Sequence, residues 1–325
     1  MAVPVWTLTL LFGLAPAAEL AAASSSSTRP EPCRANAGQT DSTLWSRTRP
    51  PELLRSCRLL ARGFARLGAE PAQALALAAD AGRVSANERA AKLLQGRAYF
   101  RLGRVAEAWV ALAPFASPGA PPLDDAASLL DVARTALAAG ALDAAERTYR
   151  LLVPRASLMG SRLVERTILI EAASLALALG PAGIDEALGY LEAARSIPLA
   201  GDRDLMLGLT ALALDRQGQS EQARAAAREA DGPWDLEREL SQAERSRVAE
   251  MALGPSGEST PPPTTLAPAR LMLVDGELHA AVALLAVGRD EALRRMHLRA
   301  FLSSAAAHGP WAEYAKRSLA KSGGR

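Results

Sequence analysis

Apolar residues recur with helical spacing along most of the chain, and glycines interrupt this pattern at nearly regular intervals. After Pro50 and Pro51 the spacing predicts helical hairpins, each closed by a glycine turn. The turn glycines stand about 35 to 40 residues apart, and they are Gly68, Gly103, Gly140, Gly180 and Gly218. This periodicity indicates repeated copies of one structural unit, with an irregular helical bundle as the alternative.

The clearest unit, LLQGRAYFRLGRVAEAWVALAPFA, runs from residue 93 to residue 116. Gly96 and Tyr99 lie in its first helix, Gly103 closes the turn, and Ala108 and Leu112 follow in its second helix. A small residue at such a position lets two helices approach closely, and the larger residue fills the adjoining gap. This pattern resembles the signature of the tetratricopeptide repeat, whose repeats are normally 34 residues long.

The same frame recurs in four other units. In each unit, the positions of the frame carry either a small residue or a large apolar one. Unit by unit these residues are Cys57, Leu60, Ala61, Phe64 and Ala74; Leu129, Val132, Ala133, Ala136, Ala145 and Tyr149; Leu169, Ala173, Ala176, Ala187 and Leu191; and Leu207, Ala211, Leu214, Ala223 and Ala227. The resemblance covers residues 51–230. It implies an all-α fold, namely a right-handed solenoid of antiparallel helical hairpins with an extended concave surface.

The region after the fifth unit is expected to close the stack. A helix is predicted over 234–253, capped by Asp235, so the repeat region would run over 51–253, and a Pro-rich linker follows at 254–268. The block 269–325 contains a hairpin around Gly288 and a last helix whose Pro-Trp-Ala start is similar to the closing helix of bacterial envelope tetratricopeptide proteins. This block is either a sixth repeat with a capping helix or a separate helical module.

The N-terminus has features of an export signal. Residues 3–14 are apolar and uncharged, they are too few to span a membrane, and small residues follow them. We expect a signal peptide over 1–23, a flexible lead-in over 24–50, and a location in the periplasm or cell envelope. The first residues contain no Lys or Arg, so an ordinary apolar tail and a cytoplasmic location are the alternatives.

Composition narrows the class of protein further. Hydrophobic residues make up 49% of the chain but aromatic residues only 4%, because alanine dominates, and alanine favours helices over sheets. A net charge of +2 without clustering gives no support for nucleic-acid binding. Cys33 and Cys57 could pair in an oxidising compartment and fix the N-terminal segment to the first helix, or they could be two unpaired thiols.

Residues typical of catalysis are scarce. The chain has no phosphate-binding loop, nucleophile elbow, metalloprotease motif or Cys-x-x-Cys motif, so we expect no enzyme activity, no cofactor and no metal site. His279, His297 and His308 fall near the C-terminus, where His279 and His297 have apolar neighbours typical of structural histidines. Asp124 with Asp125, and Asp202 with Asp204, precede or begin predicted helices and are expected to cap them.

Arginines form the one candidate site. In the repeat frame, the positions that face the groove carry Arg55, Arg58, Arg62, Arg66, Arg97, Arg101 and Arg134. Later equivalent positions, such as Ile170, Leu205 and Leu212, are apolar. Because guanidinium forks bind carboxylates in bidentate fashion, the basic end suits an acidic or C-terminal peptide. The alternative is a solvated arginine face on a terminal helix.

By resemblance to the family, the expected function is a non-catalytic scaffold or adaptor of the bacterial cell envelope that binds a peptide or a partner subunit. An alternative is an accessory or regulatory subunit of a cell-wall or surface-polymer enzyme. A helical enzyme without a recognisable motif is a third possibility, and an uncleaved N-terminus would instead indicate a cytoplasmic adaptor. The oligomeric state stays open.

Overall fold

The computed structural model describes residues 33, 51–199, 203–230, 276–277, 279–304, 307 and 309–322. These residues form helices and turns without any strand, so the prediction of an all-α fold is confirmed for them. The expected signal peptide, most of the lead-in, the helix over 234–253 and the linker lie outside the described residues, as do Asp202 and His308.

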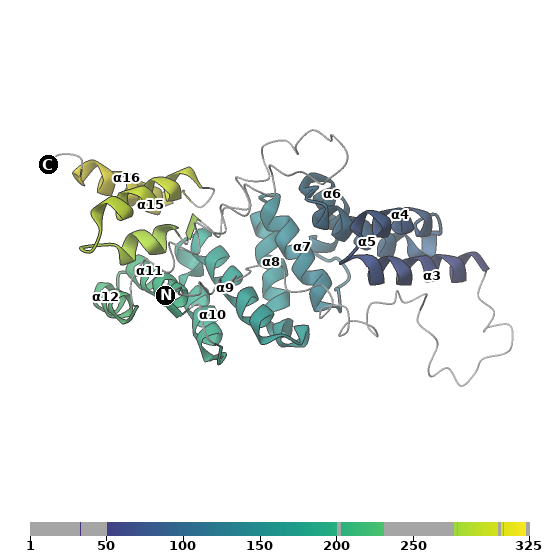
Figure 1. The fold of residues 1–325 in the computed structure, drawn as a ribbon, viewed down its shortest axis with the longest axis horizontal. Helices are drawn as coiled ribbons and strands as arrows, with labels where there is room; N and C mark the ends of the chain where they lie inside the picture. Colours follow the sequence, from purple (N-terminus) through teal and green to yellow (C-terminus); the bar gives the residue numbers. More distant parts are fainter. Residues whose placement is uncertain are drawn as a thin grey trace, which may run out of the picture.

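Consecutive helices form hairpins that follow one another along the long axis of the molecule (Figure 1). We number them 1 to 5: α3 (Pro51–Arg66) with α4 (Pro71–Ala81), α5 (Glu88–Arg101) with α6 (Val105–Ala116), α7 (Ala126–Ala138) with α8 (Leu142–Leu152), α9 (Arg162–Ala178) with α10 (Ile184–Ser196), and α11 (Arg203–Arg216) with α12 (Ser220–Glu229). Three short 3-10 turns, η2 (Ser85–Asn87), η3 (Val153–Met159) and η4 (Pro181–Gly183), lie between helices. The hairpins therefore occupy the units that the glycine spacing predicted.

Four of the five turn glycines, all except Gly68, share a left-handed backbone conformation. The φ values lie between 71° and 107°, a range that residues other than glycine rarely adopt, at Gly103, Gly140, Gly180 and Gly218. In three of these hairpins the residue after the glycine donates its N–H to a carbonyl five residues back, as in Arg104 to Tyr99 at 2.9 Å. Pro181 has no N–H to donate in this way, and η4 lengthens the turn of hairpin 4 instead.

Aspartate side chains cap the starts of α7 and α15 (Glu291–Ser303). Asp125 precedes α7, and its carboxylate accepts from the backbone N–H groups of Ala127 and Ser128, as predicted. Asp290 caps α15 in the same way through Leu293, at 2.8 Å. Asp204 lies in the first turn of α11, where the helix dipole favours an acidic side chain.

Small residues allow close packing between the helices. A Cβ at Gly96 of α5 would lie 2.6 Å from Cδ2 of Leu112 in α6, which is wholly buried. This contact agrees with the role that the sequence pattern gave to Gly96. In α3 the close approach is made by Gly63, against Leu94, whereas Ala61 is exposed.

The C-terminal block packs on hairpin 5. The buried residues Ala281, Val282 and Phe301 belong to the same core as Leu207 of α11. Arg216 of α11 and Glu277 form an ion pair of 2.6 Å with side chains only 3% and 0% exposed, and the Arg216 guanidinium lies over the ring of Trp311 in α16 (Gly309–Ser322). The described part of the C-terminal block therefore shares one core with hairpin 5.

We predict that Gly96→Ala lowers the free energy of unfolding by about 1–3 kcal/mol, because the new methyl group overlaps a buried leucine that has little room to move. Gly189→Ala in α10 is the matched control, since no atom lies within 4 Å of the position that its new methyl group would take. The control should be unchanged or stabilised by about 0.5–1 kcal/mol through helix propensity. Urea unfolding followed by circular dichroism measures both, and equal effects would contradict the close approach.

Candidate binding surface

Arg97 and Arg101 of α5 converge on one carboxylate of the next hairpin. Asp131 of α7 accepts from Nε of Arg97 at 2.7 Å and from a terminal nitrogen of Arg101 at 3.0 Å. Arg97 also donates to Oγ of Ser128, at 2.9 Å. Arg97 and Asp131 are only 7% and 1% exposed, so this cluster lies inside the interface between hairpins 2 and 3.

A second cluster joins hairpins 3 and 4. Arg134 of α7 donates two hydrogen bonds to the Glu171 carboxylate of α9, at 3.1 Å and 2.7 Å. Tyr149 of α8 donates its hydroxyl to the same carboxylate at 2.8 Å. Burial, with the adjacent Glu171 charge, raises the pKa of Tyr149 well above its ordinary value, so the phenol remains a hydrogen-bond donor.

The two clusters occupy the same register in the sequence. Arg97 and Arg134 each lie six residues before the turn glycine of their own hairpin, and Asp131 and Glu171 each lie nine residues before theirs. We call the pairs Arg97–Asp131 and Arg134–Glu171 the rungs. The equivalent acidic position in hairpin 2 is Leu94, so Arg62, the equivalent of Arg97, has no rung.

The rungs change the interpretation of three predicted site residues. Arg97, Arg101 and Arg134 were expected to present their guanidinium groups to a partner, and they bind carboxylates of the same chain instead. Sequence analysis missed Asp131 and Glu171, the two acceptors. The signal that could have found them is an acidic residue nine positions before the turn glycine, opposite an arginine of the preceding hairpin.

The arginines of α3 have a different environment. Arg55, Arg58 and Arg62 are exposed and form no ion pair or hydrogen bond with the part of the chain that the structure describes. We call these three residues the α3 arginine stripe; their spacing of three and four residues keeps them on one side of the helix. Arg66, the fourth predicted member, forms a surface ion pair with Glu70 at 3.3 Å. Of the seven predicted residues, only the stripe is thus available to an external carboxylate.

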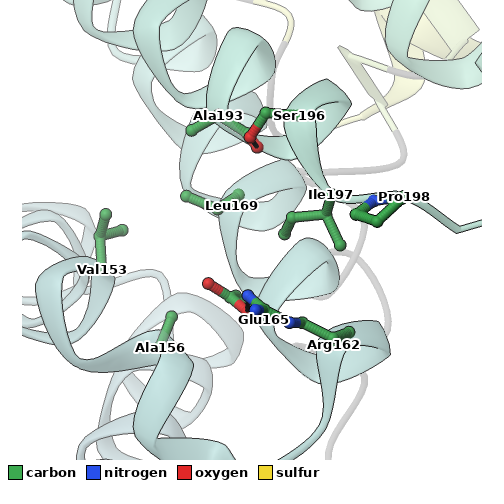
Figure 2. A pocket seen from close by; sticks show the side chains of 9 residues that line it. All are labelled: Val153, Ala156, Arg162, Glu165, Leu169, Ala193, Ser196, Ile197 and Pro198. Atoms are coloured by element: carbon green, nitrogen blue, oxygen red, sulfur yellow. Dashed lines mark hydrogen bonds and ion pairs between the residues drawn. The ribbon is translucent and has the colours of Figure 1, made fainter.

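A shallow pocket of about 330 Å³ lies between η3, the start of α9 and the end of α10 (Figure 2). Apolar side chains such as Val153, Leu169 and Ile197 line it, together with the ion pair of Arg162 and Glu165 at 2.9 Å. Its one hydroxyl, on Ser196, donates to the carbonyl of Ala193 at 2.7 Å. The lining therefore contains no nucleophile with an adjacent base, and this pocket gives no argument for catalysis.

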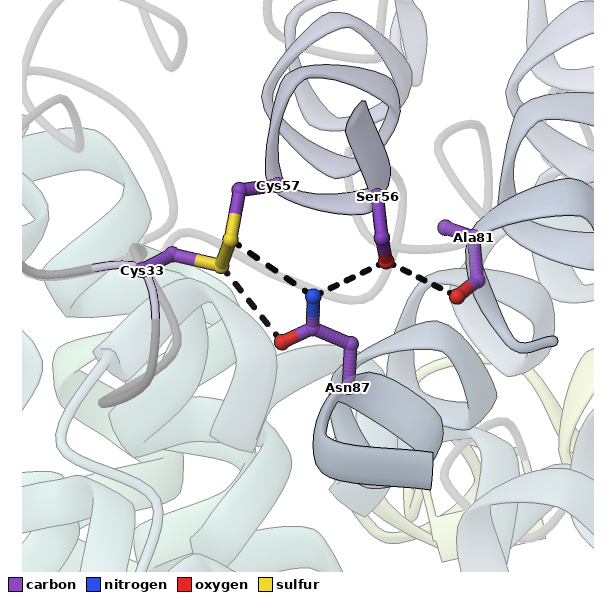
Figure 3. The surroundings of a disulfide bond; sticks show 5 residues. All are labelled: Cys33, Ser56, Cys57, Ala81 and Asn87. Atoms are coloured by element: carbon purple, nitrogen blue, oxygen red, sulfur yellow. Dashed lines mark hydrogen bonds between the residues drawn. A yellow bond between two sulfur atoms is a disulfide. The ribbon is translucent and has the colours of Figure 1, made fainter. Parts of the chain in front are cut away.

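Cys33 and Cys57 form a disulfide with their Cα atoms 5.6 Å apart (Figure 3). The side-chain nitrogen of Asn87, the last residue before α5, lies 3.5 Å from the sulfur of Cys57, and its oxygen lies 3.4 Å from the sulfur of Cys33. The same nitrogen donates to Oγ of Ser56 at 2.8 Å, and Ser56 donates to the carbonyl of Ala81 at 2.9 Å. Of the two sequence alternatives, the structure contains the paired cysteines.

Two predicted structural histidines meet in the C-terminal block. Nδ1 of His279 lies 2.8 Å from Nδ1 of His297, and both residues are 3% exposed. Burial, with a contribution from His279, lowers the pKa of His297 to about 4. His297 is therefore neutral near pH 7, and the tautomers of the two rings decide which Nδ1 donates in this contact.

Among the described residues, no helix is both long and apolar enough to span a membrane, and no three or more His, Cys, Asp or Glu side chains are grouped as metal ligands would be. No protein-family model matches the chain, and neither the curated proteins nor the solved structures give a match. Any functional conclusion must therefore come from the geometry described above.

We predict that Asp131→Ala lowers the free energy of unfolding by about 3 kcal/mol, because Arg97 stays buried without its main carboxylate. The value is expected at the low end for a broken buried pair, since Asp125 remains 3.6 Å from Arg97. Glu107→Ala is the control: its pair with Arg104 is exposed, so its loss should cost no more than about 0.5 kcal/mol. Urea unfolding measures the free energy of unfolding of both variants. Equal losses in Asp131→Ala and Glu107→Ala would show that the rung adds little to stability.

We predict a loss of stability on acidification that depends on His297. Its pKa is lowered from 6.5 to about 4 on folding, so between these values the unfolded chain binds more protons than the folded one. The free energy of unfolding therefore falls as pH drops from 6.5 toward 4, by at most about 3 kcal/mol. Unfolding curves from pH 7 to pH 4.5 should be less pH-dependent in His297→Leu than in wild type, and parallel pH profiles would contradict the assignment.

Proposed function

We propose that the protein is a non-catalytic binding scaffold built as a tetratricopeptide-like right-handed solenoid, and that the α3 arginine stripe binds an acidic segment of a partner protein. Support for the fold comes from the same glycine turn in hairpins 2, 3 and 5 and from the register shared by the two rungs. A disulfide between Cys33 and Cys57 fits an oxidising compartment, which supports a location in the periplasm or cell envelope.

One observation carries the proposed site. Farther along the stack, Arg97 and Arg134 are paired with carboxylates of the next hairpin, whereas the arginine stripe of α3 is exposed and has no such partner among the described residues. Three guanidinium groups on one side of a helix attract carboxylates over several ångströms, and each can form bidentate hydrogen bonds on contact. A segment with several Asp or Glu residues is the chemical class that matches this surface.

We expect the triple variant Arg55→Glu, Arg58→Glu, Arg62→Glu to bind a Glu-rich synthetic peptide at least about tenfold more weakly than wild type. The control replaces Arg224, Arg228 and Arg317 with Glu, which changes the net charge equally at exposed positions on other helices. Fluorescence anisotropy at two salt concentrations measures the affinity, and the wild-type affinity should fall as salt rises.

A capture experiment extends this test to natural partners. Tagged wild type, stripe variant and control variant are each used to recover proteins from native envelope extract. A protein recovered with wild type and with the control, but lost with the stripe variant, is the expected result. Equal recovery with all three, together with equal peptide affinities, would exclude the stripe as the binding site.

A further inference from the structure

Hairpin 1 has a small core of its own. The buried apolar side chains that α3 and α4 share with α5 form a cluster of three leucines and five alanines, namely Leu60, Leu67, Leu94, Ala74, Ala78, Ala81, Ala91 and Ala98. The main core begins at Leu112 and extends through hairpins 3 to 5 into the C-terminal block. Because an alanine removes little apolar surface from water, hairpin 1 gains less from burial than the hairpins of the main core.

The disulfide adds a second constraint at the same place, since it links residue 33 to Cys57 of α3 beside Asn87. Asn87 is wholly buried, and its amide group contacts both sulfur atoms and Ser56 of α3 (Figure 3). Ser56 in turn donates to Ala81, the last residue of α4. Residue 33, α3, the end of α4 and the start of α5 are therefore joined around one amide group. Both cysteines are half-buried, so a small thiol can reach the bond.

We propose that the Cys33–Cys57 disulfide is a redox-sensitive attachment that keeps hairpin 1 folded on α5, and that its reduction opens hairpin 1 while hairpins 3 to 5 remain folded. The closed loop spans 24 residues of sequence separation, and breaking the bond returns conformational freedom to that loop in the opened state. The thin core of hairpin 1 then has to hold α3 and α4 on α5 without the cross-link between residue 33 and α3.

The chemistry requires a dithiol reductant. Its thiolate attacks one sulfur of the disulfide, the sulfur–sulfur bond breaks, and a mixed disulfide forms. The second thiol of the reductant then displaces the protein sulfur, so that two electrons and two protons reach Cys33 and Cys57 and the reductant leaves as its own disulfide. If the proposed function holds, opening of hairpin 1 also disperses the α3 arginine stripe and weakens binding.

Hydrogen exchange measured by mass spectrometry tests the proposal on the full chain, independently of any partner. Oxidised protein and protein treated with dithiothreitol are compared over residues 51–81 and over residues 162–196. We expect amide exchange in 51–81 to rise at least tenfold on reduction, while exchange in 162–196 changes less than twofold. The variant Cys33→Ser should show the fast exchange in 51–81 without reductant and should not respond to dithiothreitol.

Three outcomes would overturn the proposal. Unchanged exchange over 51–81 after verified reduction would show that the core alone holds hairpin 1. A similar rise in both regions would show that the bond supports the whole fold and not hairpin 1 in particular. Two free thiols in protein isolated without reductant would show that the bond does not form. None of these results depends on the peptide-binding measurement, so the two proposals can fail separately.

Discussion

A buried guanidinium group needs a carboxylate close by, and the arrangement of hairpins 2 to 4 follows from this requirement. Arg97 and Asp131 are almost wholly removed from water, which is tolerable only because each satisfies the other. Two helix faces lined by alanines can pack at several relative positions along their axes, because alanine side chains are small and nearly identical in shape. Each rung joins two successive first helices at one offset, that of Arg97 with Asp131 or of Arg134 with Glu171.

The same requirement separates the paired arginines from the free ones. Arg62 and Arg97 occupy equivalent positions in their hairpins, but the next first helix carries Leu94 in hairpin 2 at the register position where hairpin 3 carries Asp131. Where that position carries a carboxylate, the arginine is buried in the interface between the two hairpins and forms an ion pair there. With a leucine there, it stays at the surface, where it can meet a carboxylate from another molecule.

The sequence predicts well what depends on one residue or on a local pattern. The glycine turns and the capping role of Asp125 follow from backbone chemistry within a few residues. The fate of Arg97 depends instead on its distance from Asp131, 34 residues away, and that distance is set only when hairpins pack. The pairing of Cys33 with Cys57, and the contact of His279 with His297, remained open in the sequence for the same reason.

The two ends of the described stack face a common physical problem, since a terminal hairpin has a neighbour on one side only and buries less apolar surface than an inner one. At the C-terminal end, the Arg216–Glu277 ion pair and the Trp311 ring attach the last block to hairpin 5 within the main core. At the N-terminal end the core is mostly alanine, and a disulfide links residue 33 to the first helix. An ion pair beneath a continuous core persists whatever the redox conditions, whereas a disulfide over a thin core does not. The N-terminal hairpin is therefore the part of this fold whose order can be controlled from outside, and it also carries the α3 arginine stripe.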